Sequence, residues 1–342
     1  MHQQTQQKSS ESFTCYPLPF IIYLLSFTCY PELSAETDRK RNSQMSYKIL
    51  EKEEIGTGVF RMVIEAPDVA AAAKAGQFVM IRVCETGERI PLTIADFSKE
   101  KGTVTIVVQA LGKSTKMLTA MNPGDAVADF IGPLGTPSDV RKLGTVILVG
   151  GGVGIAPIYP QISAYKEAGN HVIAVIGARN ESLLIMEKEV EEAADEYYVC
   201  TDDGSKGHHG FVTEVVKEIL DKEKEEIAAG TFKGERTARV VVIGPPILMK
   251  VAAGLMAGYP DVEIIVSINS MMVDGTGMCG GCRVIVGGEV KFACVDGPEF
   301  DGRLVDFGTV MNRLMIYRKE EAAENEMYEK SCEGGICSKL GA

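Results

Sequence analysis

Four residues in the C-terminal part of the chain combine metal-binding side chains with a distinctive spacing. They are Asp274, Cys279, Cys282 and Cys294, arranged as Asp-x4-Cys-x2-Cys-x11-Cys. A plant-type [2Fe–2S] site uses Cys-x4-Cys-x2-Cys with a more distant fourth cysteine. Here an aspartate stands at the first position, and its carboxylate oxygen is also able to bind iron. The pattern therefore predicts a two-iron cluster held by one aspartate and three cysteines.

The residues between these ligands support the same interpretation. The loop contains Gly275, Gly277, Gly280 and Gly281. Glycine permits positive φ angles and a close approach of the backbone, so such a loop can wrap tightly around a compact cluster. Zinc would favour two Cys-x2-Cys hooks, and this segment has one. Zinc and ordinary buried thiols remain the alternatives.

The composition restricts the class of protein that carries this site. The chain has 342 residues, enough for two or three domains, and its 45% hydrophobic and 24% charged residues are typical of a globular protein. Its formal net charge of −12 argues against a nucleic-acid partner. Three cysteines committed to a cluster favour a reducing compartment, so we expect the protein in the cytoplasm.

The first 44 residues differ from the rest of the chain. They contain Ser-Phe-Thr-Cys-Tyr-Pro twice, at Ser12–Pro17 and Ser26–Pro31. Their apolar core, Phe20–Leu25, is short for a signal peptide and too short to span a bilayer. Met45 directly precedes a strand-like segment. We therefore interpret 1–44 as a non-native or disordered extension, with an atypical signal or anchor as the alternative, and we expect no membrane association.

Short alternating strands separated by turn residues fill the segment from Tyr47 to about Asp129. The predicted strands include Val59–Glu65, Gln77–Val83, Thr103–Gln109 and Ala126–Ile131. Strands of this length and spacing are typical of a small antiparallel barrel. The sequence therefore predicts a β-barrel domain over 45–140.

Near Thr145 the period changes, and apolar runs begin to alternate with helical stretches. We expect strands at Val146–Val149, Val172–Ile176, Tyr197–Thr201, Val240–Ile243 and Ile264–Ser267, and helices at Ile155–Glu167 and near Leu183–Ala194, Val212–Leu220, Ile247–Ala257 and Leu304–Lys330. Strand–helix alternation indicates a parallel, doubly wound sheet. The expected domains after the barrel are a nucleotide-binding α/β domain at 141–268, a cluster subdomain at 269–305, and a helix and tail at 306–342.

Two segments of the barrel carry residues suited to a phosphate-bearing cofactor. Arg89-Ile90-Pro91-Leu92-Thr93 follows a predicted strand, and Gly112-Lys113-Ser114-Thr115 opens a predicted helix at Thr115–Met121. Free N–H groups at a helix N-terminus bind phosphate, and the forked guanidinium of arginine binds it in a bidentate way. Arg89 alone would be an ordinary surface arginine, but its spacing from Gly112–Thr115 favours a cofactor.

Three loops of the α/β domain follow predicted strands, at the edge where such sheets bind ligands. The first contains Gly150, Gly151, Gly152 and Gly154, the second Asp202 and Gly204, and the third Gly244 and Pro245. A glycine-rich loop alone is a weak signal, but its position after a barrel domain strengthens it. Asp202 and Asp203 could equally be plain turn residues.

The order of these motifs resembles the ferredoxin–NADP reductase superfamily over roughly Met45 to Lys319. Its flavin motif is Arg-x-(Tyr/Pro)-(Ser/Leu)-(Thr/Ser), and residues 89–93 match it. The resemblance implies that Arg89 pairs with the FAD pyrophosphate, that Thr93 lies near N5 of the flavin, and that Gly112–Thr115 form a phosphate site. It also implies that the Gly150–Gly154 loop packs beside the pyrophosphate of a nicotinamide nucleotide.

Within that superfamily, the cluster segment resembles a smaller group of electron-transfer flavoproteins. The group includes the electron-transfer subunit of dihydroorotate dehydrogenase, which carries cysteine where this chain has Asp274. It also includes the small subunits of sulfide dehydrogenase and of NADH-dependent reduced ferredoxin:NADP oxidoreductase. Asp274, together with the sequence CVDGPEFDG that begins at Cys294, resembles these last two families.

The resemblance implies an oxidoreductase subunit that moves electrons between NAD(H), FAD and a [2Fe–2S] cluster. It further implies a heterodimer with a large iron–sulfur flavoprotein, where electron bifurcation takes place, and ferredoxin and NADP as indirect partners. NADP remains an alternative nucleotide, because Arg179 at a strand end could bind a 2′-phosphate. No catalytic side chain is predicted, because the cofactors carry the chemistry.

Two other functions remain open at this point. One is the electron-transfer subunit of dihydroorotate dehydrogenase in pyrimidine synthesis, against which Asp274 argues. The other is a redox-sensing iron–sulfur module without flavin, against which Arg89, Thr93 and the Gly112–Thr115 segment argue. Cys332 and Cys337 are expected to be exposed thiols of the tail rather than further ligands.

Overall fold

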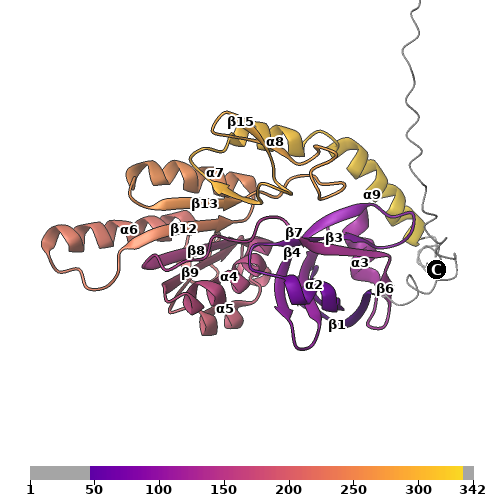
Figure 1. Ribbon diagram of the computed structural model, residues 1–342, viewed down its shortest axis with the longest axis horizontal. Helices are drawn as coiled ribbons and strands as arrows, with labels where there is room; N and C mark the ends of the chain where they lie inside the picture. Colours follow the sequence, from indigo (N-terminus) through magenta and orange to yellow (C-terminus); the bar gives the residue numbers. More distant parts are fainter. Residues whose placement is uncertain (1–46, 334–342) are drawn as a thin grey trace, which may run out of the picture. The chain divides into compact units, whose positions relative to one another are not determined.

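The computed structural model describes residues 47–333, which form an antiparallel sheet, a parallel α/β sheet and a small cluster segment (Figure 1). The predicted extension at 1–44 and Cys337 lie outside the described residues, as does the side chain of Cys332. Within 47–333, no helix combines the length and apolar character that a membrane span requires.

The first sheet has seven antiparallel strands in the order β6-β1-β2-β5-β4-β3-β7. They are β1 (Tyr47–Gly56), β2 (Val59–Glu65), β3 (Phe78–Arg82), β4 (Arg89–Ser98), β5 (Thr103–Gln109), β6 (Ala126–Val127) and β7 (Asp129–Leu134). β6 and β7 follow one another in the chain but pair with opposite edges, so the sheet curls toward a closed barrel. The segment Ala126–Ile131, predicted as one strand, is therefore divided at Ala128, where the chain passes from one edge to the other.

The interior of this barrel is apolar because β2 and β5 alternate in side-chain character. Met62 lies opposite Ile106, and Ile64 lies opposite Val104, and all four are buried. Leu118 joins the same core from α3 (Lys113–Ala120), while α2 (Pro67–Ala72) contributes smaller buried side chains. Burial of each large apolar side chain contributes about 1.5–3 kcal/mol.

The second sheet has five parallel strands in the order β10-β9-β8-β12-β13, extended by short β11 at one edge. Its strands are β8 (Thr145–Gly151), β9 (His171–Ala178), β10 (Glu196–Thr201), β11 (His208–His209), β12 (Thr237–Ile243) and β13 (Glu263–Ser267). Its helices are α4 (Ile155–Glu167), α5 (Glu187–Ala193), α6 (Val212–Ala229) and α7 (Pro246–Leu255), with short 3₁₀ turns η1 (Gly152–Gly154), η2 (Glu181–Leu183) and η3 (Met256–Gly258). α4 and α5 cover one face and α6 and α7 the other, which confirms the predicted doubly wound sheet.

The cluster segment is attached to this second sheet. β14 (Arg283–Val286) and β15 (Glu289–Phe292) form a hairpin, and β16 (Glu299–Asp301) pairs antiparallel with β13. Two helices follow, α8 (Phe307–Leu314) and α9 (Arg318–Glu333). The stretch predicted as one helix, Leu304–Lys330, is thus divided, because α8 packs on β14 and α7 while α9 packs on α3.

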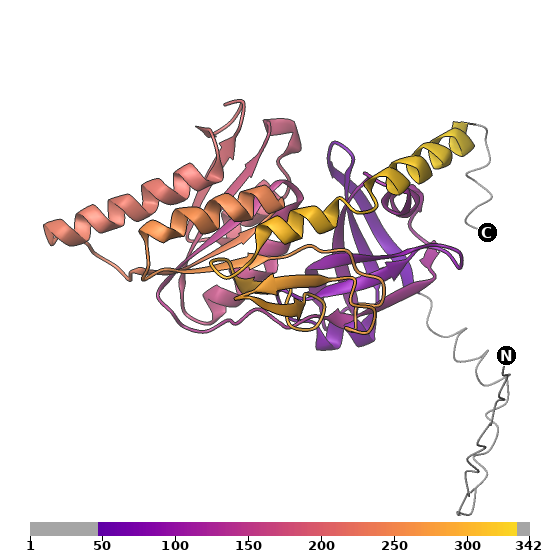
Figure 2. The ribbon, with the colours of Figure 1, turned by 90° about the horizontal axis from the view of Figure 1, so that it is seen from above.

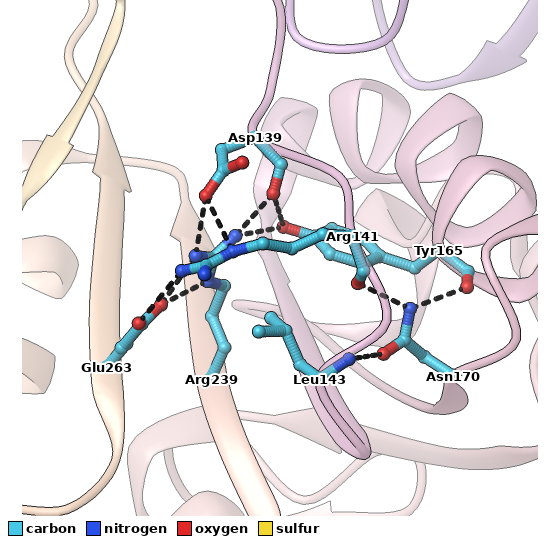
Figure 3. Close-up of polar contacts among 7 residues, drawn as sticks. All are labelled: Asp139, Arg141, Leu143, Tyr165, Asn170, Arg239 and Glu263. Carbon is cyan, nitrogen blue, oxygen red and sulfur yellow. Dashed lines mark hydrogen bonds and ion pairs between the residues drawn. The ribbon is translucent and has the colours of Figure 1, made fainter.

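A buried arginine fixes the linker that leads from the barrel into the parallel sheet. Arg239, on β12, is 3% exposed. Its guanidinium donates to the Asp139 carbonyl oxygen at 2.5 Å, to the Asp139 carboxylate at 3.0 Å, to Tyr165 Oη at 2.9 Å and to Glu263 Oε2 at 2.7 Å (Figure 3). The bond from Arg239 holds the pKa of Asp139 below its usual range. This buried charge opposes movement of the linker, since such movement would take the Asp139 carbonyl and carboxylate away from it.

A half-buried carboxyl ties the cluster segment to both domains. Glu299 Oε1, on β16, accepts hydrogen bonds from Ser138 Oγ at 2.8 Å and from Gln161 Nε2 at 2.7 Å. Ser138 belongs to the linker and Gln161 to α4. Burial raises the pKa of Glu299, although both donors favour its carboxylate form. Three parts of the molecule therefore meet at one titratable group.

Candidate functional site

The four predicted cluster ligands lie together as two pairs. Asp274 Oδ1 lies 3.4 Å from Cys279 Sγ, and Cys282 Sγ lies 3.2 Å from Cys294 Sγ. The first three residues belong to the irregular loop between β13 and β14, and Cys294 follows β15. A [2Fe–2S] cluster takes two protein ligands on each iron. The geometry thus fits one iron held by Asp274 and Cys279 and the other by Cys282 and Cys294.

The same arrangement does not suit a single zinc ion. Structural zinc takes four ligands around one point. Over residues 47–333, no group of three or more histidine, cysteine, aspartate or glutamate side chains gathers in a way that could hold one metal ion. The arrangement in two pairs therefore favours the two-iron interpretation over zinc.

The loop backbone prepares Asp274 to act as a ligand. The N–H groups of Thr276, Met278 and Cys279 donate to its carboxylate at 3.1, 2.9 and 2.8 Å. Partial burial raises the pKa of Asp274, but these backbone donors outweigh it and hold the pKa below its usual range. The side chain is therefore an anion with a fixed orientation before any metal is bound.

The three cysteines give the site an inner side and an outer side. Cys282 and Cys294 are buried, whereas Cys279 is exposed. Burial, followed by the neighbouring Cys282, raises the pKa of Cys294 to about 12. Since thiolates and not thiols bind metal, Cys294 would have to give up its proton in order to hold an iron.

Gly275 lets the cluster loop rest directly on the barrel. Its φ is +74°, and a Cβ at this position would lie 2.8 Å from both Leu134 Cδ1 and Met80 Cγ. Both distances are shorter than any ordinary carbon–carbon contact, so only glycine fits without a shift. The loop that carries Asp274 is therefore seated on β3 and β7.

The proposed flavin-binding surface is the outer face of β4, the strand that pairs with β3 beside Met80. Met80 on β3 is paired with Pro91 on β4, and Phe78 is paired with Thr93. Residues directly opposite in an antiparallel pair project to the same face of the sheet, so Pro91 and Thr93 share the outer face with Met80. We call this surface, carried by Arg89, Pro91 and Thr93, the flavin face.

Met80 and Leu134 lie against the cluster loop, and Met80 is also the β3 partner of Pro91 on the flavin face. Met80 is fully buried and belongs to the apolar core that also contains Cys282 and Cys294, with Leu134 packed against it. The side chain of Leu92, by contrast, packs on the barrel interior, so a contact of Leu92 with a cofactor can come only from its backbone. The fold therefore places the candidate flavin and cluster sites next to one another.

Arg89 takes part in an ion-pair group that the sequence did not reveal. Its Nη2 donates to Asp129 Oδ2 at 2.9 Å, and Arg82 Nε donates to the same oxygen at 2.7 Å. The bond from Arg82, offset in part by burial and reinforced by Arg89, lowers the pKa of Asp129. Cross-strand pairing of Arg82 with both Arg89 and Asp129 brings the three together, a signal visible only once the register is known.

The start of α3 presents the residues predicted to bind phosphate. Thr115 Oγ1 accepts from the N–H of Gly112 at 3.1 Å and donates to the Gly112 carbonyl at 2.9 Å, so it stabilises the turn itself. Lys113 and Ser114 point outward, to Glu324 on α9 at 2.7 Å and to Glu88 at 3.3 Å. The turn is preformed, with a lysine and a serine at its opening.

The glycine-rich loop after β8 is packed against the end of β12. A Cβ at Gly154 would lie 2.2 Å from the Ile243 carbonyl oxygen, and one at Gly151 would lie 2.5 Å from Leu248. Gly150 is crowded by Ile155 in the same way, whereas Gly152, at φ +58°, faces open space. The structure thus brings this loop together with Gly244 and Pro245, and leaves Gly152 open to a ligand.

Asp202 and Gly204 lie farther along the same edge, after β10 and beyond β9. The Asp202 N–H donates to the Ala178 carbonyl at 3.1 Å, and Gly204, at φ +73°, packs against His209. These residues do not contact the glycine-rich loop directly, but both loops lie at the carboxyl edge of the parallel sheet. That edge is where open α/β sheets bind nucleotides.

Comparison with known protein families gives a match for each of the three parts of the described chain. Residues 46–138 match the oxidoreductase FAD-binding domain, and residues 148–254 match the oxidoreductase NAD-binding domain. Residues 269–306 match the iron–sulfur cluster binding domain of dihydroorotate dehydrogenase B. The fold and sites therefore define a flavin- and nicotinamide-dependent iron–sulfur oxidoreductase subunit, which transfers electrons between FAD, NAD(H) and an iron–sulfur cluster.

Several relatives match this chain over nearly all of their own length. The chain is 49% identical over 282 residues to the uncharacterized protein in adh 3′ region of Clostridium beijerinckii, covering 80% of this chain and 92% of the relative. It is 45% identical over 284 residues to the dihydroorotate dehydrogenase B electron transfer subunit homolog of Thermotoga maritima, covering 83% and 96%. The corresponding subunit of Desulforamulus reducens is 32% identical over 261 residues, covering 74% and 94%.

Solved structures give the same result. The NADH-dependent reduced ferredoxin-NADP oxidoreductase structure matches with a TM-score of 0.74 and 45% identity, over 83% of this chain and 98% of that one. Phthalate dioxygenase reductase, at 16% identity and a TM-score of 0.50, shares the fold. The chain belongs to the family of dihydroorotate dehydrogenase B electron transfer subunits and their homologues. The predicted fold class, cofactors and enzyme class are confirmed.

Proposed function

We propose that this chain is the NAD(H)-linked small subunit of an electron-bifurcating ferredoxin:NADP oxidoreductase. The observation that carries the proposal is that Met80 lies against Gly275 of the cluster loop and is also the β3 partner of Pro91 on the flavin face. A continuous path from a nucleotide edge to a flavin and then to a cluster is what an electron relay needs. The 45% identity to the NADH-dependent reduced ferredoxin-NADP oxidoreductase structure, together with Asp274, supports this member of the family.

In this proposal, each cofactor is held by its own group of residues. Arg89 binds the FAD pyrophosphate, Pro91, Thr93 and the backbone of Leu92 line the flavin, and the turn from Gly112 to Thr115 holds phosphate. When bound, FAD exchanges hydride with the nicotinamide and single electrons with an iron–sulfur centre. The glycine loop, with Gly244, Pro245, Asp202 and Gly204, orients the nucleotide, and Asp274, Cys279, Cys282 and Cys294 bind the cluster.

The outer side of the cluster loop supports a protein partner at this surface. Met278, next to Cys279, is 88% exposed, and Val273, Ile316 and Tyr317 are also exposed. A cavity of about 400 Å³ lies among Cys279, Val273, Ile316 and Tyr317. Contiguous exposed apolar side chains mark interaction surfaces. The proposed occupant is the large iron–sulfur flavoprotein subunit of a cytoplasmic heterodimer, which in turn serves ferredoxin and NADP.

Anaerobic affinity purification of the full chain from its native cell tests this function. We expect a large flavoprotein with iron–sulfur centres to co-purify, and the complex to reduce NADP with NADH and reduced ferredoxin together. Activity with sulfide in place of ferredoxin would identify a sulfide dehydrogenase instead. Co-purification of a dihydroorotate-oxidising flavoprotein would refute the proposal.

The dihydroorotate dehydrogenase function is the second candidate, because relatives with 30–32% identity carry that name. Asp274 separates the two candidates, since the resemblance gives that family cysteine at this position. We predict that Asp274→Cys retains a [2Fe–2S] cluster but changes its reduction potential, because a carboxylate is replaced by a thiolate on iron. Redox titration followed by electron paramagnetic resonance measures the potential. An unchanged potential would exclude Asp274 as a ligand.

A further inference from the structure

Helix α9 is fastened to the phosphate-binding turn of the barrel. Lys113 Nζ, on α3, lies 2.7 Å from Glu324 Oε2 on α9, and Lys116 pairs with Glu329 one turn farther along. The two pairs join residues that are 211 and 213 positions apart in the chain. Both ribbon views show α9 crossing beside the barrel (Figures 1 and 2). The C-terminal helix therefore covers the side of the barrel where α3 begins.

A cavity lies between α9, α3 and the loop that joins β3 to β4. Its volume is about 310 Å³. Val83, Met117, Met327 and Tyr328 supply apolar and aromatic walls, and Lys113 and Ser114 supply polar groups. Ligand pockets begin near 300 Å³, so this cavity suits a nucleoside-sized group rather than a whole dinucleotide. Cys84 also lines it, as a half-buried side chain.

The position of this cavity identifies the part of the cofactor that it suits. The start of α3 is the proposed phosphate site, and the flavin face leads away from it along β4. The group on the far side of the pyrophosphate from the flavin is adenosine. We propose that α9 forms the outer wall of a site for the adenosine half of FAD, with Tyr328 stacked on the adenine and Met327 against its edge. This inference rests on the proposed FAD site at Arg89 and the Gly112–Thr115 turn.

The charges around Lys113 agree with this assignment. Its ammonium carries three N–H donors, so it can bind a phosphate oxygen and keep its bond to Glu324. The apolar side chain of Met327 is 66% exposed. A purine packed against it would cover that surface. Aromatic stacking and sulfur–aromatic contacts are the interactions that adenine offers to Tyr328 and Met327.

The test compares FAD with FMN, which lacks the adenosine half. The full chain, stripped of flavin, is titrated with each cofactor, and binding is followed by flavin fluorescence. Tyr328→Ala is expected to weaken FAD binding by about tenfold, as for loss of one stacked base, and to leave FMN binding unchanged. Tyr328→Phe retains the ring and should bind FAD as the native chain does.

Charge reversal on α9 provides the second variant and its matched control. Glu324→Lys with Glu329→Lys repels α3 and should weaken FAD binding severalfold. Glu326→Lys changes a residue that pairs with Lys330 within α9, and it should leave FAD binding unchanged. Tighter FAD binding in the double variant would mean that α9 obstructs the site, and would overturn the inference.

The outcomes separate this inference from the proposed function. If Arg89→Ala weakens FAD binding while Tyr328→Ala leaves it unchanged, the adenosine site is wrong and the FAD site stands. An equal loss of FAD and FMN binding in Tyr328→Ala also overturns the inference, because the effect would not reside in adenosine. If the native chain binds no flavin, the proposed function itself fails.

Discussion

The cluster loop and the flavin face are neighbours, yet their candidate residues are positioned in opposite ways. In the cluster loop, Asp274 is held by N–H groups two to five residues away. On the flavin face, Arg89 is held by Asp129, 40 positions away, and at the neighbouring start of α3, Lys113 is held by Glu324, 211 positions away. The first site is built from local backbone geometry, and the second from tertiary packing of separate elements.

This difference leads to different responses to mutation. A cluster needs all four ligands at once, so loss of one ligand removes the site. A dinucleotide contacts many residues, each of which contributes a fraction of the binding energy, so loss of one contact weakens binding in a graded way. The comparison would fail if single ligand changes in the cluster loop proved mild or if one change on the flavin face abolished binding.

The largest effect is expected from Cys282→Ala, which leaves no ligand atom at this position. Cys282 is 1% exposed and lies beside Cys294, so no other described thiol stands ready to replace it. We expect the purified chain to lose most of its iron and its cluster absorbance, measured by metal analysis and visible spectroscopy under anaerobic conditions. Cys84→Ala, outside the cluster loop, serves as the control and should retain full iron. A full iron content in Cys282→Ala would contradict the ligand assignment.

The next effect is expected from Arg89→Ala on the flavin face. A charge-assisted hydrogen bond contributes about 1.5–3 kcal/mol, which corresponds to roughly 10- to 100-fold in the dissociation constant for FAD. Equilibrium dialysis of the flavin-free chain measures this constant. Arg141→Ala, which removes a surface arginine of the linker, is the control. Full flavin occupancy in Arg89→Ala at limiting FAD would rule out this role for Arg89.

A smaller effect is expected where the two regions touch, at Gly275. Gly275→Ala places a residue with a side chain at a backbone position of positive φ, which costs about 1–2 kcal/mol. The new Cβ also overlaps Met80 and Leu134. Gly288→Ala is a matched control, since Gly288 has φ +81° with nothing within 4 Å of its Cβ position. We expect Gly275→Ala to lower the free energy of unfolding more than Gly288→Ala and to slow reduction of the cluster by NADH. Equal losses of stability would show that the loop is not pressed against the barrel.

Local patterns in the sequence were enough to predict most elements and to single out four candidate cluster residues that the fold brings into two pairs. Helix Ile155–Glu167 and strands Val59–Glu65 and Thr103–Gln109 occur with the predicted bounds, because each has a regular apolar period. The four candidate cluster ligands stand out because their spacing resembles that of a known cluster loop. Both features depend on residues that are near one another in the chain.

Features that depend on distant residues could not be predicted in this way. The division at Ala128 follows from the closing of the sheet, and the division between α8 and α9 follows from their packing on different partners. Asp129 joins Arg89 only through strand register, and β16 joins β13 through a tertiary contact. None of these features produces a periodic pattern or a fixed spacing in the amino-acid sequence.

The smallest effect is expected from Glu299→Gln, at the carboxyl that joins the cluster segment to both domains. Burial raises the pKa of Glu299 above its ordinary 4.5 in the folded chain, so the folded state keeps a proton that the unfolded state has released. Its contribution to stability is complete below pH 4.5 and declines as pH rises through the folded pKa, by at most about 1.4 kcal/mol per pH unit. Arg239 and Asp139 are the charged groups that act on it, with opposite signs.

Glu299→Gln should remove this decline and little else. Within the described residues, Gln161 Oε1 is buried without a hydrogen-bond partner, and it can accept from the new amide once the Gln161 side chain is flipped. Urea unfolding of the native and Glu299→Gln chains between pH 4.5 and 8 measures the difference. Glu65→Gln, at an exposed position on β2, is the control. If the native chain and Glu299→Gln show parallel pH profiles, Glu299 is an ion in the folded protein, and a fixed charge rather than a proton joins the cluster segment to the linker and α4.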